Sequence, residues 1–117
     1  MKYGAKEMEE RALLETAARM CAAARTAPKA KGLDRLETLV LTGAEKDALA
    51  DKMHQVANRE FGDSPSTSHR DAENLRAAQA VVLIGIRPMR RGLAYCSLCG
   101  FASCAACGQA GGRWVFV

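Results

Sequence analysis

Four cysteines in the C-terminal part of the chain are the side chains best suited to chemistry. Cys96, Cys99, Cys104 and Cys107 fall within twelve residues, with the spacing C-x2-C-x4-C-x2-C. Cysteine thiolates ligate zinc and iron–sulfur clusters, and closely spaced thiols also take part in disulfide exchange. The spacing therefore predicts a metal centre or a redox-active thiol site, and leaves three chemistries open.

The separation of the two cysteine pairs favours an iron–sulfur cluster over zinc. Structural zinc sites usually place about 15–20 residues between two C-x2-C pairs, so that a hairpin can bring them together. Iron–sulfur clusters accept tighter runs, such as C-x2-C-x2-C-x3-C. Gly100 and Gly108 would let the backbone wrap closely around such a cluster. An iron–sulfur cluster is the leading hypothesis, and a zinc-stapled structural or interaction module is the alternative.

Composition limits the kind of protein that carries these thiols. The chain has 117 residues and a net charge of +4, which suits one domain and an anionic cofactor or partner but gives no case for nucleic acid binding. No stretch reaches the roughly 18 apolar residues that a membrane helix needs, and the charged start has no secretory signal pattern. We therefore expect a cytoplasmic protein, where clustered cysteines are metal ligands or redox groups.

Hydrophobic periodicity predicts the elements that position the cysteines. Helices are expected at 6–25, at 43–61 (with Thr42 as N-cap and Glu45 completing a capping box) and at 71–80, with a polar loop at 62–69. Strands are expected at 36–41, 80–86 and 113–117. The first two are apolar enough to be covered on both faces.

This order of elements predicts an α/β (α+β) domain. Three to four helices would pack on a small sheet, followed by a Cys-rich loop. Residues 1–92 would form the scaffold, and residues 93–117 the cysteine loop and terminal strand. So thin a sheet needs further strands, from a missing portion of the chain or from a second subunit.

Three segments together resemble a family of uncharacterised bacterial and archaeal ferredoxin-domain proteins. They are AARTAPKAKGLDRLETLVLTG, AQAVVLIGI and YCSLCGFASCAAC. The resemblance implies a 4Fe–4S cluster held by Cys96, Cys99 and Cys104, and a role in electron transfer. Family members are longer and carry a cysteine where this chain has Trp114. Either Cys107 supplies the fourth ligand, or the cluster has three protein ligands.

The first half of the chain also resembles nitroreductase-type flavoproteins. In that family a helix, an Ala-Pro loop, a strand and a helix form one side of an FMN site at a homodimer interface. The resemblance implies that Arg25, Lys29 and Lys31 face a flavin phosphate, although exposed cations after a helix are commonly just solvated. A flavin-dependent reductase half-domain is thus a third hypothesis, and whether the chain is an enzyme stays open.

The remaining polar residues suggest no separate active site. Cys21 lies on the apolar stripe of the first helix and is expected to be a buried small residue. His54 and His69 have no carboxylate pattern around them and are expected to be ordinary surface or loop residues. The arginine-rich run at 87–92 could dock an acidic redox partner protein or balance the negative charge of a cluster.

Overall fold

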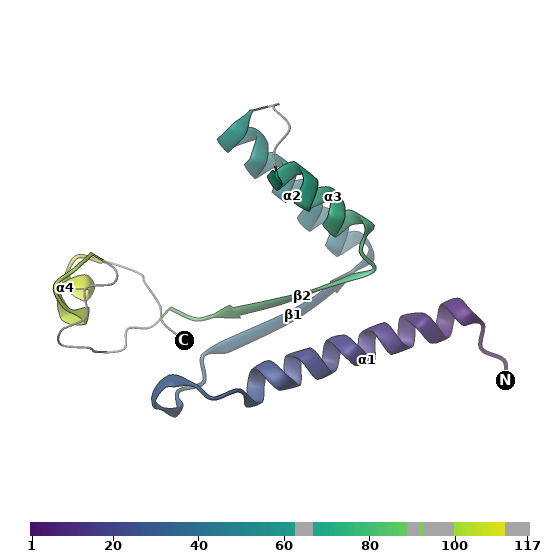
Figure 1. Cartoon of the computed structure of the whole chain (residues 1–117), viewed down its shortest axis with the longest axis horizontal. Helices are drawn as coiled ribbons and strands as arrows, with labels where there is room; N and C mark the ends of the chain where they lie inside the picture. Colours follow the sequence, from purple (N-terminus) through teal and green to yellow (C-terminus); the bar gives the residue numbers. More distant parts are fainter. Residues whose placement is uncertain (63–66, 89–91, 93–99, 112–117) are drawn as a thin grey trace. The chain divides into compact units, whose positions relative to one another are not determined.

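The computed structural model describes residues 1–62, 67–88, 92 and 100–111 of the chain (Figure 1). Its described part contains four α-helices and a two-stranded antiparallel sheet, which confirms the mixed α+β class. The elements are α1 (Ala5–Thr26), a 3₁₀ turn (Ala30–Gly32), β1 (Leu36–Thr42), α2 (Gly43–Phe61), α3 (Thr67–Ala77), β2 (Ala80–Ile86) and α4 (Cys104–Gln109). No helix in these ranges is both long and apolar enough to cross a membrane.

Contacts along the chain divide it into two compact units. The first unit joins Met1–Ala22 with Thr38–Ile84, and the second joins Ala23–Glu37 with Gly85–Val117. The first unit thus contains most of α1, most of the sheet, and the helices α2 and α3. The second unit contains the turn after α1, the first residues of β1, the last residues of β2, and α4.

The sheet pairs two strands of seven residues each. The backbone N–H of Arg87 donates to the carbonyl oxygen of Arg35 at 2.9 Å, and this antiparallel register sets Leu39 opposite Leu83. These two side chains are 53% and 38% exposed. The prediction that both strands are covered on both faces is therefore wrong, because the described residues leave this apolar face open.

Alanines form the contact between α2 and α3, which lie side by side in Figure 1. Ala50, Ala57 and Ala72 are essentially inaccessible to solvent. Small side chains let two helix backbones approach closely, and the close approach buries the apolar faces of both helices. Helix α3 begins at Thr67, inside the predicted polar loop, because packing against α2 supports residues whose own helix propensity is weak.

A buried lysine caps the C-terminal end of α3. Lys46 of α2 is 5% exposed, and its Nζ donates to the carbonyl oxygens of Arg76 at 2.6 Å and Leu75 at 3.4 Å. It also pairs with Asp47 Oδ1 at 2.7 Å. A cation here satisfies carbonyl groups that have no partner within the helix and complements the helix dipole.

Two local predictions fail at the ends and faces of the helices. Thr42 precedes α2 as expected, but its side chain makes no capping hydrogen bond, so the capping box with Glu45 does not form. Both residues are exposed, where water can satisfy the first N–H groups of the helix. On α1, Ala17 is buried while Leu14 is exposed, and Cys21 is only half-buried rather than buried.

We predict that Ala72→Leu lowers the free energy of unfolding by about 1–3 kcal/mol, because a larger side chain cannot fit between α2 and α3 without moving a backbone. Urea unfolding followed by circular dichroism measures the change. Ala48→Leu, on an exposed position of α2, is the matched control and should be nearly neutral. Equal stability of the two variants would contradict the close packing at Ala72.

We predict that Lys46→Met lowers stability by about 1–3 kcal/mol, since the carbonyl groups at the end of α3 lose their buried donor. Lys52→Met, on an exposed position of the same helix, should change stability by less than about 0.5 kcal/mol. Thermal unfolding of both variants provides the comparison. A Lys46→Met protein as stable as the wild type would show that water replaces the ammonium group at no cost.

Candidate metal and redox site

Two of the four clustered cysteines lie on α4. Ser103 caps this helix, because its Oγ accepts a hydrogen bond from the N–H of Ala106 at 3.1 Å. The cap fixes the first turn, and residues three apart on a helix lie on the same face. Cys104 and Cys107 therefore lie on one face of α4. They are 9% and 2% exposed, and both are free thiols.

The second cysteine pair is thus presented by a helix and not by a loop. The segment CAACGQ contains two alanines behind the Ser103 cap, and both features favour helix. Cys96 and Cys99 lie outside the described residues, as do Trp114 and the predicted strand 113–117. Within the described ranges, no group of three or more His, Cys, Asp or Glu residues is arranged to hold a metal ion. The described part of the predicted centre is therefore one buried pair of thiols.

Arg25, which was predicted to face a flavin phosphate, is engaged with its own chain. Its Nη1 donates to both carboxylate oxygens of Asp34 at 2.8 Å and to the carbonyl oxygen of Leu36 at 3.0 Å. These bonds hold the pKa of Asp34 below its ordinary value and raise the pKa of Arg25. They tie the end of α1 to the start of β1.

Lys29 is engaged as well, while Lys31 occupies a turn. The Lys29 Nζ donates to the carbonyl oxygens of Ala24, Arg25 and Ala27 at 2.6–2.8 Å. These hydrogen bonds cap the C-terminal end of α1. Lys31 adopts a left-handed conformation (φ 58°) in the 3₁₀ turn. A phosphate group that bound Arg25 and Lys29 would have to displace several of these intramolecular bonds.

A histidine cluster joins α2 to α3, and the sequence analysis missed it. The Nδ1 atoms of His54 and His69 are 2.7 Å apart, and the two rings meet end to end with centroids 5.1 Å apart and planes inclined by 27°. His54 Nε2 lies 2.6 Å from Glu73 Oε1. The expectation of two unrelated surface histidines is wrong. A signal was present, because His54 follows Ala50 by four residues and precedes Ala57 by three, which places it on the face of α2 that packs against α3.

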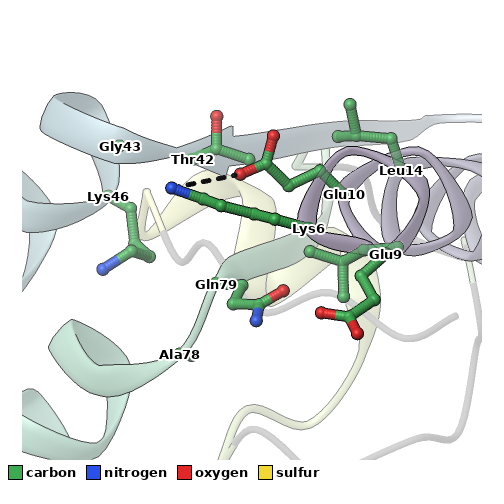
Figure 2. A pocket seen from close by; sticks show the side chains of 10 residues that line it. Lys6, Glu9, Glu10, Leu14, Thr42, Gly43, Lys46, Ala78 and Gln79 are labelled. Carbon is green, nitrogen blue, oxygen red and sulfur yellow. Dashed lines mark ion pairs between the residues drawn. The ribbon is translucent and has the colours of Figure 1, made fainter. Parts of the chain in front are cut away.

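A hollow of about 490 Å³ lies in the first unit (Figure 2). Its charged side chains are of both signs, and Lys6 forms an ion pair with Glu10 at 4.0 Å. The lining residues come from α1, from the junction of β1 with α2 and from the link between α3 and β2: Lys6, Glu9, Glu10, Leu13, Leu14, Thr42, Gly43, Lys46, Ala78 and Gln79. Mixed charge of this kind does not select one class of ligand, and none of the predicted site residues that the structure describes lines the hollow.

Comparison with known proteins identifies one informative relative. An uncharacterised protein of Archaeoglobus fulgidus is 43% identical to this chain over 86 residues, which are 74% of this chain and 45% of the relative. The matched region thus spans less than half of the relative's length. No model of a known protein family matches the chain, and no solved structure matches it.

We predict that the ion pair between Arg25 and Asp34 stabilises the chain above the ordinary carboxyl pKa of 3.8. Because the folded-state pKa of Asp34 lies below that value, the contribution is complete at higher pH and is lost as the pH falls through the folded-state pKa. The stability difference between wild type and Asp34→Asn should therefore shrink in acid. Urea unfolding between pH 7 and pH 2 tests this.

The partner of Asp34 supplies the control for the acid experiment. In an Arg25→Met background, Asp34→Asn should have a much smaller effect at neutral pH, because the guanidinium group is the main cause of the shift. An effect of Asp34→Asn that is independent of both pH and Arg25 would contradict this assignment.

Proposed function

We propose that the chain is an iron–sulfur protein of the ferredoxin-domain type that holds a 4Fe–4S cluster and transfers electrons. Cys96, Cys99, Cys104 and Cys107 are the proposed ligands. The observation that carries the proposal is the buried pair of free thiols, Cys104 and Cys107, on one face of α4. The proposal places the protein in the cytoplasm, where such thiols stay reduced until they bind metal.

Burial favours ligation of these thiols over free thiolate chemistry. A thiolate without a counter-charge is costly to bury, whereas a metal ion compensates the charge and keeps the sulfur deprotonated. Burial on one side of α4 also limits solvent exposure of a bound cluster, which is one of the factors that set its reduction potential. The C-x2-C-x4-C-x2-C spacing then supports a cluster over a zinc hairpin.

In this proposal the cluster takes up and releases single electrons, and the chain supplies ligands, hydrogen bonds and a docking surface. The arginine-rich run at 87–92 is the proposed contact for an acidic redox partner protein. Arg87, the arginine of this run that the structure describes, is exposed and pairs with Glu37 at 3.3 Å. An acidic partner would compete with Glu37 for this guanidinium group.

The proposed scaffold is nitroreductase-like and pairs with a second copy of the chain. The support is the open apolar face of the sheet, where Leu39 and Leu83 are exposed. Burial of apolar side chains under another layer lowers the free energy of the folded protein. Flavin binding is not part of the proposal, since Arg25 and Lys29 already bind groups of their own chain.

Zinc is the second candidate, because the same buried thiol pair is also half of a tetrahedral zinc site. In that case the four thiolates stabilise the fold, and a chelator that removes the metal unfolds the cysteine segment. Iron with acid-labile sulfide separates the first candidate from the second, since zinc sites contain no inorganic sulfide.

We predict that Cys104→Ser and Cys107→Ser each remove most of the iron, acid-labile sulfide and visible absorption from anaerobically purified protein, because each loses a thiolate ligand. Cys21→Ser is the matched control, since Cys21 is a half-buried thiol on α1, outside the cluster. It should keep about four irons per chain, as the wild type does. Unchanged iron in both Cys104→Ser and Cys107→Ser would refute the ligand assignment for α4.

A further inference from the structure

The two histidine rings between α2 and α3 face each other through the same ring atom. The Nδ1 atoms of His54 and His69 are 2.7 Å apart, and the Nε2 of His54 is hydrogen-bonded to Glu73. All three residues belong to the first compact unit, and none belongs to the cysteine cluster. The proposed electron transfer gives this contact no role, and it does not explain what lies between the two nitrogens.

The hydrogen bond to Glu73 fixes the proton on His54. A carboxylate can only accept hydrogen bonds, so Glu73 Oε1 accepts a hydrogen bond from the N–H at His54 Nε2. In the neutral imidazole, His54 Nδ1 then carries a lone pair directed at His69. At 2.7 Å a second lone pair would be repelled, so a positively polarised atom must lie between the rings.

We propose that His54 and His69 bind a divalent first-row transition-metal ion, such as Zn²⁺ or Ni²⁺, through their Nδ1 atoms. The metal ion takes the place of the proton that otherwise joins the rings. Glu73 is a positioning residue, because a metal-bound histidine commonly donates its other N–H to a carboxylate that fixes its tautomer and orientation. Water molecules complete the coordination.

Binding of this ion requires both imidazole rings to move from their present end-to-end contact. Metal–nitrogen distances of about 2.0–2.1 Å place two histidine nitrogens about 2.9 Å apart at a right angle and about 3.3 Å apart at the tetrahedral angle. The two Nδ1 atoms must therefore move apart by about 0.2–0.6 Å from their present 2.7 Å, and the rings must turn so that both lone pairs point at one ion. The His54 side chain is 27% exposed, so metal and water can reach it.

Arg76 fixes the position of the carboxylate that contacts His54. Asp51 of α2 pairs with Arg76 of α3, and Arg76 also lies 3.7 Å from Glu73. Arg76 therefore neutralises Asp51 and also lies near the Glu73 Oε1 atom that His54 contacts. The alanine contact between α2 and α3 fixes the separation of the two helices that carry the rings, so the two nitrogens are held together before a metal arrives.

The test is calorimetric titration of Ni²⁺, which imidazole ligands bind well, into the full chain and its variants. The wild type should bind one Ni²⁺ per chain that His54→Gln and His69→Gln each bind at least about tenfold more weakly. Glu73→Gln should weaken the same site by about tenfold or more, as removal of an outer hydrogen-bond partner does. Gln55→Ala, an exposed change on α2, is the control and should bind as the wild type does.

The thiols are identical in all these variants, so any difference between them reports the histidine site and not the cysteine cluster. Equal Ni²⁺ affinity and stoichiometry in the wild type and both histidine variants would overturn the proposal and leave a proton as the link between the rings. Unchanged binding by Glu73→Gln would overturn the role of Glu73.

A second measurement needs no variant and remains decisive if a substitution unfolds the chain. Nitrogen NMR of the wild type should show the His54 and His69 Nδ1 signals moving together when Zn²⁺ is added. Unmoved signals at a several-fold molar excess of Zn²⁺ over the chain would overturn the proposal.

Discussion

The close approach of α2 and α3 is the contact on which the first unit depends. Ala50, Ala57 and Ala72 are small enough to bring the two helix backbones together, and none of the described large side chains is fully buried in their place. This approach puts Lys46 within reach of the last carbonyl groups of α3. It also brings the histidine rings of the two helices into contact. A larger residue at an alanine position would disturb all three features at once.

Local sequence signals predicted much of the fold. The periodicity of α1 and α2 and the apolar runs of β1 and β2 follow from neighbouring residues, and the observed bounds lie close to those expected. The exposure of Leu39 and Leu83 did not follow, because an apolar strand does not reveal whether anything covers it. The prediction that this helix begins at residue 71 was wrong for a similar reason, because its observed start at Thr67 depends on contact with α2.

The candidate sites show the same division between local and distant causes. The cysteine spacing predicted a thiol site, and the structure adds that Cys104 and Cys107 share a buried helix face. The intramolecular bonds of Arg25 were not foreseen, because its partner Asp34 lies beyond a turn of unknown geometry. The histidine pair was missed because His54 and His69 come together only when two helices pack. The spacing of His54 from Ala50, which places both residues on the same face of α2, could have indicated the contact.

In the proposed function, the four cysteines hold an iron–sulfur cluster. The most direct measurement is the content of iron, zinc and acid-labile sulfide in one anaerobically purified sample of the unmodified chain. We expect about four irons and four sulfides per chain, the stoichiometry of a single 4Fe–4S cluster. Zinc bound to the thiols without sulfide would contradict it and would assign the buried pair on α4 to a structural zinc site.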